Sequence, residues 1–93
     1  MNIVWDEQKD VRLKAERRIS FVEIELLILQ KKYIDIMKHP RRPGQWMFIL
    51  PVRGYIYVVP FVVDEDGNIV LKTAFPSRKF NKRFEGKRHE NKA

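Results

Sequence analysis

The segment "QWMFILPVRGYIYVVPFVVDEDGNIVLKTAF", residues 45–75, contains three runs rich in β-branched and aromatic residues. An Arg-Gly pair at 53–54 separates the first run from the second. The Asp-Gly pair at 66–67, a strong hairpin signal, separates the second from the third. Proline has no N–H to donate to a neighbouring strand, so Pro51 and Pro60 are expected at strand ends or bulges. The segment therefore predicts three strands in succession.

A short apolar run at 2–5 predicts a first strand, followed by a helix that begins after Asp6 and continues to about Arg17. The Asp6 carboxylate can accept hydrogen bonds from the free N–H groups of the first turn. The outer face of this helix is basic, and we interpret that face as a solvated surface rather than a binding site. It carries Lys9, Arg12, Lys14, Arg17 and Arg18.

The strongest local signal begins at Ser20, which has Glu23 three positions later, the spacing of a capping box. Ile19 before the cap and Ile24 after it fit a hydrophobic staple. The helix that follows is apolar on nearly every side. We therefore expect most of its surface to be covered and the helix to pack across a sheet.

The remaining elements complete the order β-α-α-β-β-β-β-α. Residues 33–38 alternate as a strand does, and residues 39–44 are rich in proline and glycine, which predicts a loop. Residues 78–86 can form a short final helix, and Phe80 and Phe84, four positions apart, should pin it to the domain. The chain is predicted to be a single α+β domain at 1–86, with a helical pair on a mainly antiparallel sheet and a frayed basic tail at 87–93.

The composition narrows the functional classes. The 93 residues are 44% hydrophobic and include no cysteine, so disulfides, thiolate nucleophiles and cysteine metal sites are excluded. No apolar run is long enough to span a membrane, and residues 1–10 lack the pattern of a signal peptide, so we expect a cytoplasmic protein. No zinc pattern, phosphate-binding glycine loop or serine-nucleophile elbow is present, and we expect no cofactor or metal.

The net charge of +7 is concentrated near the C-terminus. From Lys72 onward the chain has eight Lys or Arg and two acidic residues, whereas residues 1–71 have eleven basic and ten acidic residues. Such an excess favours a polyanionic partner or an acidic protein surface. A tail that only keeps a small protein soluble is the alternative.

Strand alternation assigns faces within the last predicted strand. Thr73 and Phe75 share a face with Ile69 and Leu71, and we expect that face to pack on the helices. Lys72 then lies on the open face of the sheet. Arg78 and Lys79 follow just beyond the strand end, where Lys79 could contribute to RNA binding.

Two tyrosines and one histidine could add chemistry to these cations. Tyr55 and Tyr57 share a strand face, and an open sheet with aromatic and cationic side chains can hold single-stranded RNA; equally, the tyrosines could complete the core. Cleavage of RNA without a metal needs a base, an acid and cations on the phosphate. His39, beside Arg41 and Arg42, is a candidate acid or base, or else a plain loop histidine.

Short motifs across nearly the whole chain resemble the BrnT family of bacterial toxins, RelE-like ribonucleases of type II toxin–antitoxin modules. They are Trp5, Asp6 and Lys9; Ile19, Ser20, Phe21 and Glu23; Arg53-Gly54 before "YIYVV"; and Lys72, Ser77, Arg78 and Lys79. The sequence departs from the family at three places. Glu16, Arg17 and Arg18 replace a common Lys-His-Gly, Gln45-Trp46 replaces an acidic-Arg pair, and Pro76 is an extra residue.

The resemblance implies a RelE-like fold and an mRNA-cleaving inhibitor of translation. It also implies a hetero-oligomer with a ribbon-helix-helix, BrnA-like antitoxin, through which the complex binds operator DNA. Lys72 and Arg78 would stabilise phosphate and transition-state charge, Arg53 would be a further cation, and Tyr57 or His39 would transfer protons. Because the Lys-His-Gly histidine is missing, two alternatives stay open: a non-catalytic nucleic-acid-binding module, or a degenerate toxin that retains only antitoxin binding.

Overall fold

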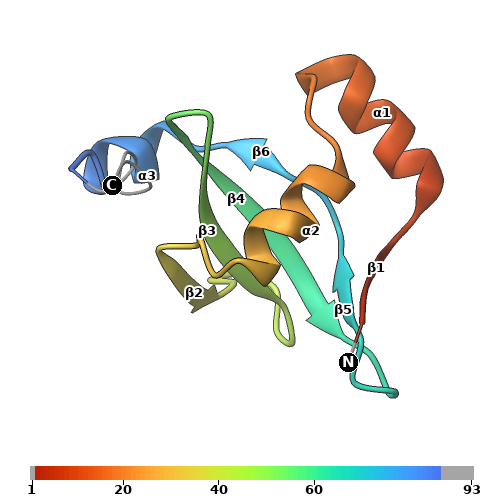
Figure 1. Ribbon diagram of the computed structural model, residues 1–93. Helices are drawn as coiled ribbons and strands as arrows, with labels where there is room; N and C mark the ends of the chain where they lie inside the picture. The colour runs from red at the N-terminus through yellow and green to blue at the C-terminus, as the bar shows by residue number, and fades with distance from the viewer. Residues whose placement is uncertain (1, 87–93) are drawn as a thin grey trace.

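The computed structural model describes residues 2–86, which form three helices and a six-stranded sheet (Figure 1). The elements in chain order are β1 (Ile3–Trp5), α1 (Glu7–Arg17), α2 (Phe21–Leu29), β2 (Asp35–Lys38), β3 (Trp46–Val52), β4 (Tyr55–Val63), β5 (Ile69–Leu71), β6 (Phe75–Pro76) and α3 (Arg78–Arg83). This confirms the predicted α+β class and element order, except that the last predicted strand is divided into β5 and β6. The tail predicted at 87–93 lies outside the described residues.

The sheet is mainly antiparallel, with strand order β1-β5-β4-β3-β2, and β6 pairs with β4. Only β1 and β5 run parallel. β3 and β4 form a hairpin whose two-residue turn, at 53–54, has both φ angles positive (51° and 82°). Two positive φ angles are the signature of the type I′ turn, whose twist matches that of the strands it joins.

The hairpin predicted at 64–68 is also confirmed. The Asp64 carboxylate accepts from the backbone N–H groups of Asp66 and Asn68, at 3.0 and 2.8 Å. The hydrogen bond from Asn68 lowers the pKa of Asp64, because a donor stabilises the ionised form. The Asp64 carboxylate therefore stabilises the turn.

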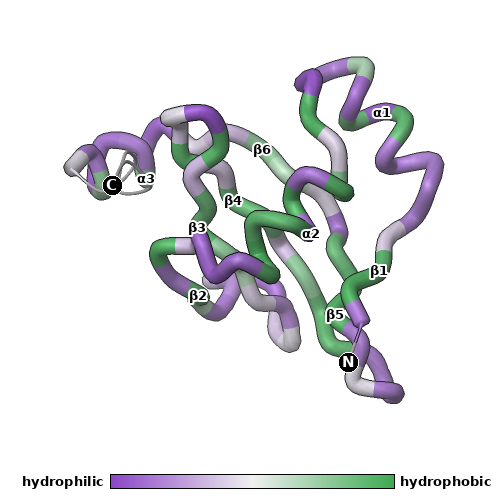
Figure 2. The backbone as a smooth tube through the Cα atoms, in the orientation of Figure 1, coloured by the Kyte–Doolittle hydropathy of each residue, from purple (hydrophilic) through white to green (hydrophobic). Residues whose placement is uncertain are grey.

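Hydrophobic residues are frequent in α2 and along the strands (Figure 2), and they form one core cluster on each face of the sheet. On one face α2 packs on alternate residues of β3 and β4, among them Phe48 and Val59. On the opposite face α3 covers a smaller cluster of Met47, Ile49, Ile56 and Val58. Phe80 and Phe84 of α3 pack on this cluster with their ring centroids 6.1 Å apart. The prediction that this pair pins the last helix is confirmed.

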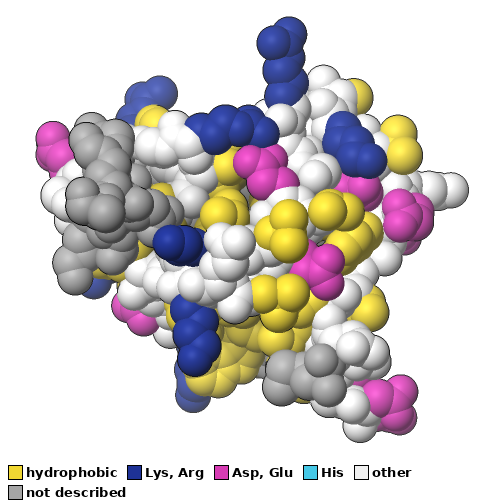
Figure 3. Space-filling view, in the orientation of Figure 1, with side chains coloured by type: hydrophobic (Ala, Val, Ile, Leu, Met, Phe, Trp, Pro, Cys, Tyr) yellow, Lys and Arg dark blue, Asp and Glu magenta, His cyan; other side chains and the backbone are white. Residues whose placement is uncertain are grey.

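α2 is covered on one side only, so the expectation that most of its surface would be covered is wrong. Phe21, Ile24 and Ile28 are buried against the sheet, and Ile19 is buried with them. Three apolar residues on the outer side, Val22, Leu26 and Leu29, are each at least half exposed. Hydrophobic side chains accordingly gather on the molecular surface over α2 (Figure 3). Neither α2 nor any other helix within residues 2–86 has the length and apolarity needed to cross a membrane.

α1 is attached to the rest of the fold by two buried residues, Asp10 and Leu13. Its N-terminus is capped as predicted, since the Asp6 carboxylate accepts from the N–H groups of Gln8 and Lys9. Asp10 is 2% exposed and accepts a 2.8 Å hydrogen bond from the backbone N–H of Phe21, the first residue of α2. That N–H has no partner within its own helix, so Asp10 satisfies it from the neighbouring helix.

Replacing Asp10 should therefore destabilise the fold. Asp10→Ala leaves the buried Phe21 N–H without an acceptor and is expected to lower the free energy of unfolding by about 1–3 kcal/mol in urea denaturation. Asp10→Asn retains an acceptor oxygen and should recover part of this loss. The control is Lys14→Ala, which removes only the exposed partner of the 3.2 Å Lys14–Asp10 ion pair and should cost less than about 0.5 kcal/mol. Equal effects of Asp10→Ala and Lys14→Ala would contradict this account.

Candidate nucleic-acid interface

A bulge between β5 and β6 determines which residues face the open side of the sheet. Leu71 of β5 pairs with Phe61, whereas Phe75 of β6 pairs with Val58. Three residues thus lie between these pairs on the β5–β6 side and only two on β4. One extra residue is the definition of a β-bulge. Pro60 lies opposite it and accepts from the Lys72 N–H at 2.9 Å, in keeping with the expectation of a bulge or strand end at this proline.

The bulge reverses the expected faces of Thr73 and Phe75. Both were predicted to pack in the core beneath the helices, but both are exposed, and Ala74 is fully buried in their place. An extra residue shifts the alternation of the strand by one, so every later side chain changes face. Lys72, Thr73 and Phe75 consequently line one groove, together with Pro60.

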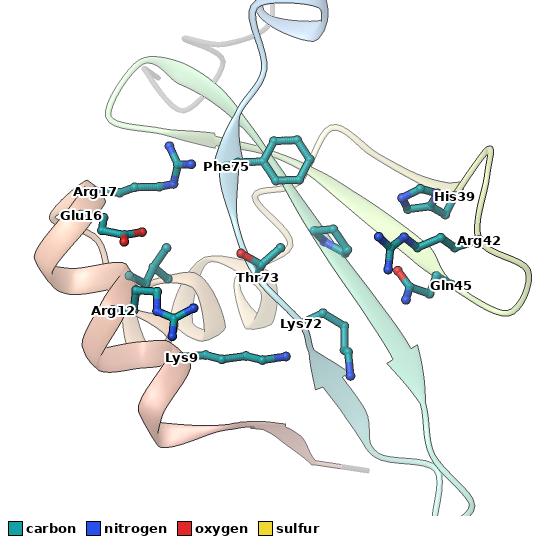
Figure 4. Close-up of a pocket in the computed structure, with 12 residues that line it drawn as sticks. Lys9, Arg12, Glu16, Arg17, His39, Arg42, Gln45, Lys72, Thr73 and Phe75 are labelled. Carbon is teal, nitrogen blue, oxygen red and sulfur yellow. The ribbon is translucent and has the colours of Figure 1, made fainter.

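One face of α1 forms the second wall of this groove (Figure 4). Lys9, Arg12, Glu16 and Arg17 follow the i, i+3, i+4 spacing of a single helical face, and all four line the cavity. The sequence interpretation assigned the α1 cations to a solvated surface and so missed this wall. Their shared helical face was visible in the sequence, but the strand end opposite it was not.

The loop between β2 and β3 supplies the third wall through His39, Arg42 and Gln45. His39 is half-buried, and its Nδ1 accepts a 3.1 Å hydrogen bond from the backbone N–H of Arg41. Because Nδ1 is the acceptor, the neutral ring carries its proton on Nε2. His39 therefore has its Nε2–H left to donate a hydrogen bond to a ligand in the groove.

The groove is a strongly basic cavity of about 430 Å³. Five of its lining residues are cations and one is an acid; the cations are Lys9, Arg12, Arg17, Arg42 and Lys72. Within residues 2–86 the ion pairs are Lys14–Asp10 and Arg53–Glu23, and neither involves a groove cation. Clustered cations without acidic partners repel one another and attract anions. The cavity can therefore bind a polyanion such as a nucleic-acid backbone.

Arg53 lies outside the groove and makes structural contacts. Its guanidinium donates at 2.7 Å to the Glu23 carboxylate and at 3.2 Å to the Arg18 carbonyl. These bonds join the β3–β4 turn to the C-terminus of α1 and the start of α2. The Ser20 hydroxyl caps α2 by accepting from the Glu23 N–H, as predicted, whereas the Glu23 carboxylate pairs with Arg53.

The other predicted site residues are also away from the groove. Tyr57 is half-buried against the core beneath α2, so its strand face is not the open one. Tyr55 is exposed beside the β3–β4 turn. Arg78 and Lys79 belong to α3, where with Lys82 and Arg83 they form a second cationic surface. The structure thus brings Lys72, His39 and Arg42 together, but not Arg78.

No family model and no curated protein matches this sequence. A structural match was found to the crystal structure of BrnT, a ribonuclease toxin of Brucella abortus, with a TM-score of 0.63. The match covers 83% of this chain and 96% of that one, at 19% sequence identity. The chain has the BrnT fold. The fold expected from the short BrnT-like motifs is therefore confirmed.

Several residues of these BrnT-like motifs have structural roles. Trp5 packs on Phe21 with ring centroids 5.7 Å apart, Asp6 caps α1, and Ser77 caps α3 by accepting from the Phe80 N–H. Lys9 and Lys72 differ from them, because both line the groove. The motifs thus account mainly for the BrnT fold, and only these two residues connect them to the candidate site.

The Arg53–Glu23 pair should contribute modestly to stability. Its side chains are 58% and 32% exposed, so solvent screens the interaction, and Arg53→Ala should lower the free energy of unfolding by less than about 1 kcal/mol. Glu23→Gln should have a similar effect. In a double-mutant cycle by urea denaturation, the double variant should be little worse than either single variant. Fully additive effects would show that the two residues act independently.

Proposed function

We propose that this chain is a ribonuclease toxin that binds RNA in the basic groove and cleaves it without a metal ion. The observation that carries the proposal is the set of five groove cations that have no acidic partner among the described residues. A row of cations can follow several phosphates of one strand, and such contacts supply most of the affinity for nucleic acid. The BrnT fold supports the assignment to ribonuclease toxins.

In the proposed reaction the 2′-oxygen of a ribose attacks the adjacent phosphorus, and the bond from phosphorus to the 5′-oxygen breaks. The 2′-hydroxyl gives its proton to a base, and an acid protonates the departing 5′-oxygen. The products are a 2′,3′-cyclic phosphate and a 5′-hydroxyl. Lys72, with Arg12 and Arg42, is positioned to stabilise the charge on the phosphate. His39 is the candidate acid of the groove, because its Nε2–H can donate to the departing 5′-oxygen, and the base is not assigned to a groove residue.

The roles predicted for the residues outside the groove stay predictions. Arg78 and Lys79 lie on the cationic α3 surface, which can hold a further part of a bound strand. Arg41 neighbours the groove and can add phosphate contacts. Arg53 and Tyr57 have less support from geometry, since one is paired with Glu23 and the other packs on the core.

We also propose a biological setting, which the BrnT fold and the basic groove support. The toxin cleaves mRNA in the cytoplasm, inhibits translation and arrests growth. A ribbon-helix-helix antitoxin neutralises it in a hetero-oligomer and carries the complex to operator DNA. Acidic residues of such an antitoxin can occupy the same groove cations as RNA phosphates, which would block the site.

Lys72→Ala tests the groove directly. The wild-type protein should cut a labelled single-stranded RNA in the presence of EDTA and leave 2′,3′-cyclic phosphate ends. Lys72→Ala should weaken RNA binding and reduce the slope of log affinity against log salt by about 0.7, the loss expected for one phosphate contact with a single strand. Lys32→Ala is the control, because Lys32 follows α2 and is not a lining residue of the groove.

Two other outcomes of the same assay select the alternatives. Salt-dependent binding without cleavage would identify a non-catalytic RNA-binding module. Absence of both binding and cleavage, with retained affinity for the antitoxin encoded beside it, would identify a degenerate toxin.

Growth assays separate the groove from the α3 surface. Induced expression should arrest growth and deplete mRNA, and Lys72→Ala should relieve both effects because it removes a cation from the site of cleavage. Arg78→Ala is predicted to relieve them as well if the α3 surface participates. Relief by Arg78→Ala but not by Lys72→Ala would indicate that the active site lies on α3 and not in the groove.

A further inference from the structure

Apolar side chains line the groove together with the cations, among them Phe75 and Pro60. Phe75 is 37% exposed. Figure 4 shows its ring directed into the space between α1 and the β2–β3 loop, with Arg17 on one side and His39 and Arg42 on the other. An exposed phenylalanine among cations can stack its flat face on an aromatic group. The groove therefore suits a ligand that has both an anionic part and an aromatic part.

A nucleotide has both of these parts. Its phosphates fit the cations of the walls, and its base has a π-face that can stack on an aromatic side chain. Stacking requires that the base be unpaired and turned toward the protein. In a duplex the base faces are covered by their neighbours, and only the backbone remains available to the walls.

We propose that Phe75 is a base-stacking residue that makes the groove selective for RNA with an unpaired base. This inference rests on the proposed RNA binding, and it assigns the recognition of the base to Phe75 and that of the phosphates to the cations. The bulge after β5 is what turns Phe75 toward the groove. Phe75 thus positions the strand and takes no part in proton transfer.

The test is a double-mutant cycle between the protein and the RNA. A short single-stranded RNA is prepared with one abasic nucleotide placed in turn at each position, which removes a base and keeps every phosphate. For the wild-type protein, one position should lower affinity by about 5- to 100-fold, the range expected for loss of one stacked base. For Phe75→Ala, intact RNA should bind that much more weakly, and the abasic change at that position should have little further effect.

Three further variants test whether the effect comes from stacking on the aromatic ring of Phe75. Phe75→Trp should retain the sensitivity to the abasic position, and Phe75→Leu, which keeps an apolar side chain of similar bulk, should lose it. Trp46→Ala is the matched control, since Trp46 is 38% exposed, lies on β3 outside the groove lining and contacts Lys38. The salt dependence of binding should be unchanged in all Phe75 variants, because no phosphate contact is removed.

The two proposals fail in different ways. If the wild-type protein binds no RNA, the proposed function itself is wrong. If it binds intact and abasic RNA equally well, or if Phe75→Ala and Phe75→Leu remain as sensitive to the abasic position as wild type, RNA binding stands and the stacking role of Phe75 is wrong.

Discussion

The hydrogen bond from the Phe21 N–H to the Asp10 carboxylate holds α1 against the start of α2. Asp10 and Leu13 are the buried residues of α1, and the Arg53 guanidinium adds a hydrogen bond to the Arg18 carbonyl at the end of the helix. Most of the α1 surface therefore remains exposed to solvent, and one of its faces forms the basic wall of the groove. The Asp10 carboxylate thus helps to place three cations, Lys9, Arg12 and Arg17, across from the sheet. The fold contributes to the site through this helix as much as through the strands.

The second constraint is the single extra residue between β5 and β6. In a regular strand Lys72 and Phe75 would point to opposite faces, because they are three positions apart. The bulge places both on the open face and leaves Ala74 to fill the core with its small side chain. A cation and an aromatic ring are thereby brought into one cavity by a backbone irregularity and not by the alternation of the strand. Bulges often serve sites in this way, since they redirect a side chain without disturbing the rest of the sheet.

These two features also explain what could be predicted from sequence. Period and turn signals predicted the element order, the caps at Asp6 and Ser20 and the pinning of α3, because each depends on residues close together in the chain. Strand alternation also predicted that Lys72 lies on the open face, and the basic loop at 39–44 made His39 a candidate acid or base. These signals could not predict that α1 lies opposite the end of β5, since this depends on long-range packing. The reversed face of Phe75 was missed for a related reason: Pro60 suggested a bulge, but its effect depends on which strand carries the extra residue.

Some residues of the BrnT-like motifs stabilise the fold and others line the groove. Only those in the groove bear on RNA cleavage. Asp6, Ser20 and Ser77 cap helices, so their presence favours the fold whether or not RNA is cleaved. At the positions where the sequence pattern has Lys-His, this chain has Glu16 and Arg17, and both line the cavity. Among the described residues, the histidine that lines the groove is His39, on the wall opposite α1. The position of this histidine depends on the β2–β3 loop and not on a helix, because the Arg41 N–H donates to its Nδ1 and leaves the Nε2–H available to the groove.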